Sequence, residues 1–424
     1  MKYEPLGKYV SLSQGLVVNK STEHLFADKQ DDVFVHPLLR IVDFESNRHS
    51  DFSKYVSSSI SDKVIIDEKT IVYTRVTCQC FRGFKGVVHN NLFIVKLIND
   101  EIVEDYLYTI LQSSFVKKQA LTYAQSSVVP DLTHEMFKSI IIPVPDRKVQ
   151  ESIASIYGSI SEKIENNNAI CSDLEGMAKL LYDYWFVQFD FPDEKEKPYK
   201  SSGGKMVWNE HLKRRIPEDW TVERLGNYCN FENGDRSNNY PSGDDFIPIG
   251  IPFIAGGAIK DNGINYTELR YISEEKFCSL RAGKANYGDI LMTLRGSLAK
   301  YVLSPFEKLA IASALVIVRP KGIVTNEYLY SVLTSDYYNQ LMSNYNNGSV
   351  QANLSVDVVR TFPIIIPDKA IMDRFSKVQC ELIKMKILLD SENRQLTTIR
   401  DFLLPMLLNG QVKVKETENT LSEM

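Results

Sequence analysis

The chain has 424 residues, 44% hydrophobic and 24% charged, a composition that excludes wholesale disorder and predicts two to three globular domains. It has no apolar run near the ~18 residues of a membrane span, no apolar signal-peptide core at its start, and too few cysteines for a secreted disulfide framework, so we expect a cytoplasmic protein without membrane contact. The 49 basic and 54 acidic residues give a net charge of −5, so any nucleic-acid surface must be local.

Residues 1–145 are predicted to form a first α/β domain. Short runs rich in β-branched residues, such as 70–74 and 92–98, lie between polar turns and are typical of strands. A helix is predicted from about Val103 to Gln119. The run from Ile140 to Pro145 ends the domain as a strand, because prolines lack the donor that would continue it.

A long helix is predicted for residues 146–189, where the hydrophobic period changes from two residues to about 3.5. Such a period keeps an apolar seam facing a partner helix. The asparagines at 166–168 interrupt the seam, and they indicate either a polar contact that fixes register or a kink. The residues that we expect to pair with a partner helix are Ile153, Ile156, Ile160, Leu174 and Leu181.

The charged residues, prolines, serines and glycines of residues 190–216 predict a linker, and residues 217–367 then repeat the first domain. Glu4-Pro5-Leu6-Gly7-Lys8-Tyr9, followed by Gly15, returns 219 residues later as Glu223-Arg224-Leu225-Gly226-Asn227-Tyr228, followed by Gly234. Farther on the offset is a constant 222, as for Tyr106-Leu107-Tyr108 and Tyr328-Leu329-Tyr330. One shift held for so long predicts two copies of one fold.

The second copy repeats the helix prediction, from about Asn326 to Met342, and ends in a second long helix at 368–410. Each seam is longer than one small domain can bury, which favours pairing of the two long helices over ordinary core packing. Residues 411–424 are predicted to be a polar tail. The seam residues expected on the second helix are Phe375, Val378, Leu382, Leu389, Leu396 and Leu403.

We predict no catalytic residue, no cofactor and no metal site. Cys78-x-Cys80 lacks the second ligand pair of a zinc site, and a duplicated active site would show its reactive residues twice. The chain has no G-x-G-x-x-G, and its P-loop look-alike at 202–205 has Tyr199 where the first glycine belongs. The chain is therefore expected to bind and position rather than to catalyse.

Two windows at the same place in both copies are basic. Residues 69–96 contain five lysines and arginines and no acidic residue, and residues 290–320 contain four against Glu307 alone. The windows indicate two phosphate-facing surfaces, although a chance run of solvated charges would look the same. The DNA contacts that we expect here are Arg75, Arg82, Lys85, Arg295, Ser297 and Lys300.

A second polar loop follows the mid-domain helix in each copy. Amide and hydroxyl side chains can read base edges, although the same residues also form ordinary turns. The loops differ between copies while their flanks agree, as two surfaces with different targets would, although neutral drift predicts this too. The DNA contacts expected from these loops are Gln125, Ser126, Asn346, Asn347, Ser349 and Gln351.

Over essentially its whole length the chain resembles the DNA specificity (S) subunit of type I restriction–modification enzymes. The most specific strings are Leu180-Leu181-Tyr182-Asp183-Tyr184-Trp185-Phe186 with its continuation to Pro192, residues 197–206, and Leu403-Leu404-Pro405-Met406-Leu407-Leu408-Asn409-Gly410. Residues 250–254 and 288–293 look like the target-recognition domain of that family. The first copy departs from it, with Tyr73-Thr74-Arg75 where the second has Met292-Thr293-Leu294-Arg295.

The resemblance implies two tandem-duplicated α/β target-recognition domains joined by two long antiparallel coiled-coil helices, with a pseudo-twofold axis. It implies that each domain reads one half of a bipartite, asymmetric site in double-stranded DNA and that the helices set the gap between the halves. It also implies docking of two modification (methyltransferase) subunits and of restriction subunits, which supply adenine methylation and DNA cleavage. The alternative is a duplicated coiled-coil scaffold that joins protein partners without reading DNA.

Overall fold

The computed structural model describes residues 2–19, 21–41, 43, 54–60, 65–124, 131–260, 263–294, 300–345 and 355–408. The chain divides into two compact units, which we call the first unit (residues 1–167 and 392–424) and the second unit (residues 168–391). None of the described helices combines the length and the apolar composition that crossing a membrane requires.

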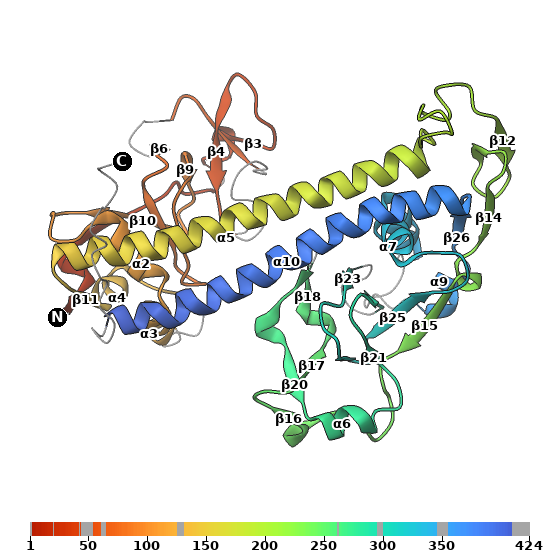
Figure 1. Cartoon of the computed structure of the whole chain (residues 1–424). Coiled ribbons are helices and arrows are strands. Elements are labelled where there is room, and N and C mark those ends of the chain that lie inside the picture. Colours follow the sequence, from red (N-terminus) through yellow and green to blue (C-terminus); the bar gives the residue numbers. More distant parts are fainter. Residues whose placement is uncertain are drawn as a thin grey trace, which may run out of the picture. The chain divides into compact units, whose positions relative to one another are not determined.

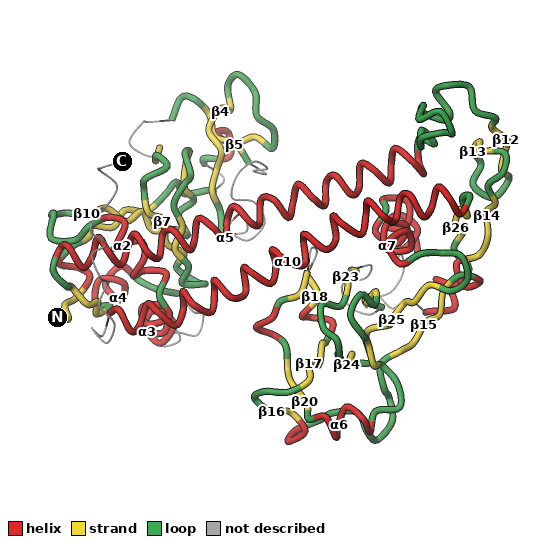
Figure 2. The backbone as a smooth tube through the Cα atoms, in the orientation of Figure 1, coloured by secondary structure: helices red, strands yellow, loops and turns green. Residues whose placement is uncertain are grey.

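The first unit contains two sheets and a short strand pair (Figures 1 and 2). The first sheet is antiparallel, with the order β2 (Val10–Gln14), β10 (Leu92–Leu97), β7 (Ile71–Thr74) and β8 (Cys80–Phe81). The second has the order β3 (Phe26–Ala27), β5 (Tyr55–Ser57), β4 (Phe34–Leu39), β9 (Gly86–Val88) and β6 (Ile65–Ile66), and only β4 and β9 run parallel. The pair consists of β1 (Lys2–Pro5) and β11 (Ile141–Val144).

The second unit has the same sheets in the same order, which confirms the tandem duplication of an α/β domain. Its first sheet is β15 (Cys229–Asn233), β25 (Leu315–Pro320), β22 (Ile290–Thr293) and β23 (Tyr301–Leu303). Its second sheet is β16 (Phe246–Ile247), β20 (Arg270–Ile272), β17 (Ile251–Ile254), β24 (Leu309–Ile311) and β21 (Lys284–Ala285), in which β17 and β24 are parallel. Here β14 (Thr221–Arg224) pairs with β26 (Pro363–Ile366).

The second unit also contains two hairpins and a short helix beyond this shared order. The hairpins are β12 (Met206–Asn209) with β13 (Arg214–Pro217), and β18 (Ile259–Lys260) with β19 (Gly263–Ile264); the helix is α6 (Glu274–Ser279). The first of these hairpins lies at the end of the segment that we expected to be a linker. That segment is ordered, because the Phe191 ring stacks on Tyr199 and Trp220 with centroid distances of 4.7 and 4.8 Å.

The helix predicted from about Val103 to Gln119 is in fact two helices, α2 (Glu104–Gln112) and α3 (Ser114–Ala124). Ser113 separates them because its backbone is extended (φ −64°, ψ 147°) and its Oγ accepts the N–H of Val116 at 3.2 Å. The second prediction is corrected in the same way, since Ser335 separates α7 (Asn326–Thr334) from α8 (Asp336–Tyr345). Short helices α4 (His134–Ser139) and α9 (Val356–Arg360) follow in the two units.

The repeated glycines are repeated for steric reasons. A Cβ atom on Gly15 would lie 1.9 Å from the carbonyl oxygen of Val88, and one on Gly234 would lie 2.4 Å from that of Ala312. No side chain can be placed at such distances without moving the backbone. These positions therefore preserve the contact of the second sheet with the end of β2 in the first unit and of β15 in the second.

The repeated tyrosines are repeated because they satisfy buried backbone groups. The Tyr106 hydroxyl donates to the carbonyl oxygen of Pro143 at 2.8 Å, and the Tyr328 hydroxyl donates to that of Ile365 at 2.7 Å. Both side chains are fully buried. Each tyrosine ties a domain helix to the strand that leads into a long helix.

The long helices are α5 (Arg147–Tyr182), which ends in a π-helical turn (Asp183–Val187), and α10 (Lys369–Leu408). Within the first unit, the end of α10 joins the domain core, where Leu404, Leu407 and Leu408 lie in one cluster with Ile153 and Tyr157. The string from Leu403 to Leu408 that resembles the known family is therefore a core-packing segment.

Within the second unit, the end of α5 packs on the domain core in the same manner. The Phe186 ring lies 4.8 Å from that of Tyr328 and 4.9 Å from that of Phe375, and Trp185 lies in the same cluster. In the alignment of the two copies at an offset of 222 residues, Trp185 and Phe186 correspond to Leu407 and Leu408, which lie in the first-unit core. Both family strings are thus equivalent packing segments that differ in aromatic content.

The two long helices contact each other antiparallel inside each unit. In the first unit, the Lys163 ammonium lies 3.3 Å from the Glu392 carboxylate and Tyr157 contacts Arg400; in the second, Lys386 lies 2.7 Å from Glu175. Along the contacting pairs, the residue numbers increase on α5 while they decrease on α10, so the two helices run antiparallel.

The helix α5 continues through 166–168, so the asparagines do not break it, and Asn167 forms a polar contact instead. Asn167 is fully buried, and its Nδ2 donates to Glu392 Oε2 at 2.7 Å and to Asn393 Oδ1 at 2.9 Å. This contact holds one register of α5 against the middle of α10.

Burial along the predicted seams is uneven. Ile153 and Phe375 are fully buried, and Leu174 is 8% exposed. Val378 differs from the expectation, because it is 47% exposed while its neighbour Gln379 faces the core. The remaining predicted seam residues are partly buried: Ile156, Ile160, Leu181, Leu382, Leu389, Leu396 and Leu403.

Candidate nucleic-acid interface

The basic window of the first unit contains a tightly closed hairpin loop, residues 75–79, between β7 and β8. The backbone N–H of Thr74 donates to the Gln79 carbonyl at 2.8 Å, and the N–H of Gln79 donates to Thr74 Oγ1 at 2.8 Å. Cys78 takes the left-handed conformation (φ 51°) that the turn requires. The threonine thus clamps the loop that begins with Arg75.

Arg75 is held in place by the side chains of Asp131 and Phe93 and by the backbone of Leu132. One guanidinium nitrogen lies 2.5 Å from the Asp131 carboxylate, the guanidinium carbon lies 5.6 Å from the centre of the Phe93 ring, and 22% of the side chain is exposed. The Arg75 carbonyl accepts the N–H of Leu132 at 3.1 Å. Asp131 and Leu132 come just after the second predicted loop, which contains Gln125 and Ser126. Arg75 begins the first predicted loop, so its contacts with Asp131 and Leu132 join the two loops at this point.

His134 also lies beside Arg75, a neighbour that the sequence analysis did not identify. Its ring lies 4.7 Å from Phe93, and burial together with the positive charge of Arg75 lowers its pKa. The histidine is therefore neutral at physiological pH and adds no positive charge to this surface. Gln125 and Ser126, the contacts expected from the second loop, lie outside the described residues.

Arg82 and Lys85 lie on a turn that follows β8. Arg82 forms an ion pair with Asp105 at 2.5 Å, and its guanidinium lies 4.5 Å above the Tyr108 ring of α2. Gly83 and Gly86 give the turn its shape, with φ values of 97° and 155°. Lys85 is exposed and has no ion-pair partner among the described residues, so its charge remains available to an anion.

The second unit closes its hairpin loop with the same clamp. The N–H of Thr293 donates to the Lys300 carbonyl at 3.0 Å, and the N–H of Lys300 donates to Thr293 Oγ1 at 3.1 Å. Lys300 is the half-buried residue at the end of this loop. The other contacts expected from this unit lie outside the described residues: Arg295, Ser297, Asn346, Asn347, Ser349 and Gln351.

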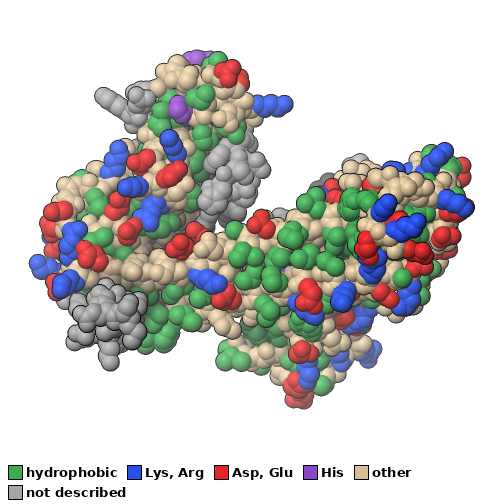
Figure 3. Space-filling model, turned by 45° about the horizontal axis from the view of Figure 1, so that its top comes forward, with side chains coloured by type: hydrophobic (Ala, Val, Ile, Leu, Met, Phe, Trp, Pro, Cys, Tyr) green, Lys and Arg blue, Asp and Glu red, His purple; other side chains and the backbone are tan. Residues whose placement is uncertain are grey.

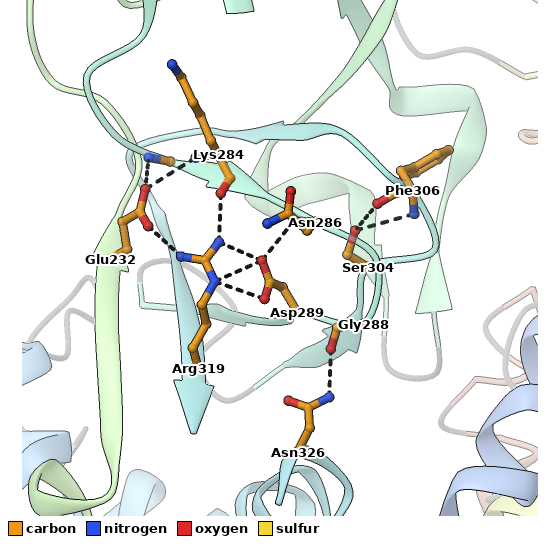
Figure 4. Close-up of polar contacts among 10 residues, drawn as sticks. Glu232, Lys284, Asn286, Gly288, Asp289, Ser304, Phe306, Arg319 and Asn326 are labelled. Carbon is orange, nitrogen blue, oxygen red and sulfur yellow. Dashed lines mark hydrogen bonds and ion pairs between the residues drawn. The ribbon is translucent and has the colours of Figure 1, made fainter. Parts of the chain in front are cut away.

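Arg319, part of the second basic window, is an internal brace (Figure 4). Its guanidinium binds both carboxylate oxygens of Asp289, with contacts of 2.6 to 3.0 Å, and the Glu232 carboxylate at 2.6 Å. It also donates to the Lys284 carbonyl at 2.7 Å. The Asp289 hydrogen bonds raise the pKa of Arg319, and those to Glu232 add to the effect.

Both basic windows have less unpaired positive charge than their sequences alone indicate. Arg75, Arg82 and Arg319 bind carboxylates, and Lys308 binds Glu274 at 2.6 Å. On the face drawn in Figure 3, lysines and arginines are interspersed with aspartates and glutamates. A DNA surface here must therefore use a few positioned cations and not a broad basic patch.

The cysteines of the first window have no features of a metal or nucleophilic site. No group of three or more potential metal ligands occurs among the residues that the structure describes. Burial raises the pKa of the Cys78 and Cys80 thiols, which keeps them protonated. Cys78 belongs to the domain core.

Three comparisons with known proteins agree with the duplication. The sequence model described as the type I restriction modification DNA specificity domain matches twice, over residues 17–175 and 217–389. The type I restriction enzyme MjaIX specificity subunit of Methanocaldococcus jannaschii is 24% identical over 339 residues, covering 79% of this chain and 73% of that protein. The HindI specificity subunit of Haemophilus influenzae is 23% identical over 387 residues, covering 77% and 81%.

A solved structure has the same fold. It is the S subunit of a type I restriction–modification system from M. genitalium, which aligns with a TM-score of 0.56 at 15% identity and covers 96% of this chain and 95% of that one. Likeness at this identity extends to the architecture and not to individual contacts. The two sequence matches correspond to the two copies described above.

Proposed function

This chain belongs to the type I restriction–modification DNA specificity family, and we propose that its two domains each read one half of a bipartite, asymmetric site in double-stranded DNA. It is a specificity subunit and is itself non-catalytic. In this proposal, partner subunits supply adenine methylation and DNA cleavage.

The observation that carries the proposal is the duplicated loop clamp. Thr74 and Thr293 close equivalent hairpins with the same pair of hydrogen bonds, and the sequence of each hairpin contains an arginine, Arg75 or Arg295, at its first or second position. A clamped loop on a rigid sheet limits the entropy that is lost when it enters a groove. Two such loops on two copies of one scaffold suit two half-sites.

Within each domain, we expect arginine to read a base edge while nearby lysines and backbone groups contact phosphates. In the first domain, Asp131 engages one guanidinium nitrogen of Arg75, which orients the remaining donors. The exposed Lys85 supplies a phosphate contact. One good bidentate contact to a base contributes about 1–3 kcal/mol of discrimination against the wrong base.

The long helices are proposed to form an antiparallel coiled-coil spacer about a pseudo-twofold axis, setting the gap between the half-sites. The antiparallel contacts within each unit support this. Large exposed apolar side chains on the helices, such as Leu180 (70% exposed), Leu388 (69%) and Phe402 (61%), support docking of two modification subunits and of restriction subunits.

Methylome sequencing of a host that expresses this chain with its modification subunits tests the proposal. We expect one two-part motif with methylated adenine in each part, present only when the gene is present. A control host would carry the modification subunits alone. If no motif appears although the complex assembles, the chain joins proteins without reading DNA, as in the scaffold alternative.

A further inference from the structure

The second unit contains a hollow of about 430 Å³ between the end of α5, the start of α8, β26 and the hairpin of β12 and β13. Its wall is largely apolar, with contributions from Leu212, Val332 and Ile364. Two further apolar side chains of the wall, Val187 and Tyr337, are 40% and 43% exposed. Exposed apolar side chains around a hollow favour a protein partner, which would cover them, over a small molecule that fills the hollow alone.

Arg214, on β13, is a half-buried cation in this wall. One guanidinium nitrogen donates to the Phe186 carbonyl at 3.3 Å, and the guanidinium carbon lies 4.8 Å from the centre of the Phe189 ring. No carboxylate of the described residues binds it. The nearby tyrosines do not neutralise it, because burial raises the pKa of Tyr182 and of Tyr337 and keeps both phenols protonated. Most of its N–H donors therefore remain available to a group in the hollow.

Other half-buried arginines of this chain show how such a charge is normally satisfied. Five of them each bind a carboxylate at 2.5 to 3.2 Å: Arg40, Arg75, Arg82, Arg319 and Arg400. A charge that is partly removed from water without a counter-ion costs free energy, and a ligand that supplies the counter-ion removes this cost. Arg214 therefore indicates a ligand that carries an anion.

Two carboxylates in the same wall decide which anion fits. Lys179 binds both oxygens of Asp336, at 2.9 and 2.8 Å, whereas Asp183 is half-buried and its pKa is raised by burial. A phosphate group carries nearly two negative charges and is repelled by these groups more strongly than a single carboxylate is. The hollow thus favours a carboxylate that is accompanied by apolar groups.

We propose that this hollow docks a segment of a modification subunit in which an aspartate or glutamate lies beside apolar side chains, with its carboxylate bound to Arg214. The proposal rests on the proposed function in taking the modification subunit as the partner. A guanidinium presents paired N–H donors that match the two oxygens of a carboxylate. The apolar neighbours of that carboxylate would cover Val187 and Tyr337.

The first unit differs at the equivalent positions. An offset of 222 residues aligns Asp183 with Pro405 and Asp336 with Ser114, so the described charges of the wall are replaced by neutral side chains. Tyr337 aligns with Phe115, which is 42% exposed, so the apolar character is kept. The hairpin that carries Arg214 has no counterpart among the described strands of the first unit. Docking through a carboxylate is therefore expected at the second unit and not at the first.

Isothermal titration calorimetry of the full chain with the modification subunit of the same system tests the proposal. We expect wild type to bind two modification subunits. Arg214→Gln keeps an amide donor for the Phe186 carbonyl but removes the charge, and it should weaken one of the two binding events about tenfold and leave the other unchanged. Arg215→Gln, an exposed arginine on the opposite face of β13, is the matched control and should bind as wild type does.

Circular dichroism and the fluorescence of Trp185 and Trp220, which lie in the second-unit core, would verify that both variants are folded. If folded Arg214→Gln binds both modification subunits as tightly as wild type, or loses affinity equally at both sites, the proposal is wrong. If wild type itself binds no modification subunit, the docking part of the proposed function fails as well, so the two failures are distinguishable.

Photo-crosslinking identifies the docked segment without changing Arg214. Tyr337→benzoylphenylalanine places a photoreactive group at the exposed edge of the hollow. In the assembled complex it should crosslink to a stretch of the modification subunit that contains an acidic residue among apolar ones, as mass spectrometry of the digested product would show. A crosslinked stretch without an acidic residue, or no crosslink to the modification subunit, would overturn the proposal.

Discussion

The first and second domains have the same strand order but differ in their loops and in the side chains that brace them. What they share is backbone geometry: the glycines at 15 and 234, the buried hydroxyls of Tyr106 and Tyr328, and the threonine clamps. The loops and the side chains that brace them differ between the two domains. The comparison teaches that the backbone frame can be kept while the loops change, which the proposed reading of two half-sites of different sequence requires.

One internal difference involves matched positions on the central strands. The strand register pairs Ser11 with Lys96 and Asn230 with Arg319, so Lys96 and Arg319 occupy equivalent places. Lys96 is exposed and has no ion-pair partner among the described residues, whereas Arg319 binds Asp289 and Glu232. The same window position is therefore a solvated charge in one domain and a structural brace in the other.

The largest expected effect tests the shared frame. Gly234→Ala places a methyl group against the Ala312 carbonyl and should reduce the free energy of unfolding by about 3 kcal/mol, as forced overpacking does. All three tryptophans, Trp185, Trp208 and Trp220, lie in the second unit, so tryptophan fluorescence during urea unfolding reports on that unit.

Gly15→Ala is the matched change in the first unit. It should shift the transition followed by circular dichroism while moving the tryptophan transition less. Gly176→Ala, on α5 with nothing within 4 Å of the added methyl group, should stabilise by about 1 kcal/mol because alanine favours helix. Equal behaviour of Gly234→Ala and Gly176→Ala would show that the close approach is not a constraint.

The next effect sharpens the difference between the matched cations. Arg319→Ala leaves the mostly buried Asp289 carboxylate without its partner and should destabilise the second unit by about 2 kcal/mol, below the cost for a fully buried pair because 30% of the arginine side chain is exposed. Lys96→Ala should change stability by no more than about 0.5 kcal/mol. Urea unfolding measures the stability of both variants. Similar losses of stability in the two would contradict the assignment of Arg319 as a brace.

A smaller effect tests the polar contact between the long helices. The shift of 222 puts Leu389 at the position of Asn167, so α10 has an apolar side chain where α5 has this buried amide. Asn167→Ala should cost about 1 kcal/mol through its lost hydrogen bonds. Asn166→Ala, on the exposed side of the helix, is the control and should be nearly neutral.

This contact should also depend on pH. The hydrogen bond from Asn167 and then the one from Lys163 lower the pKa of Glu392. A lowered pKa in the folded state contributes stability that is present above the ordinary glutamate pKa of 4.5 and is lost as the pH falls through the folded-state pKa. The stability difference between wild type and Asn167→Ala should therefore shrink in acid, and a difference that grows there would contradict this explanation.

The duplication could be predicted from the sequence because its constraints are steric and local. Gly15 and Gly234 tolerate no side chain, so the pattern survived in both copies. The helix breaks at Ser113 and Ser335 were not predicted, because the apolar spacing continues through them. The repeated serine was the available signal, since its hydroxyl caps the next helix in both units.

The charge of the candidate interface could not be predicted from the windows alone. The carboxylates that neutralise Arg75 and Arg319 come from Asp131 and Glu232, which lie 56 and 87 residues away in the chain. Only the tertiary fold brings them together. The sequence does repeat a threonine shortly before each arginine, at 74 and 293, but it could not reveal that Arg75 is held in place by Asp131.

The most direct test of the central claim measures DNA binding with each half-site altered separately. In gel-shift titrations of the methyltransferase reconstituted with this chain, Arg295→Ala should bind the intact site about tenfold more weakly. It should also lose the penalty for altering one half-site while keeping the penalty for the other. Arg224→Ala, an exposed arginine of β14, should match wild type. If Arg295→Ala keeps wild-type affinity for the intact site and both penalties, the second domain does not read DNA through this loop.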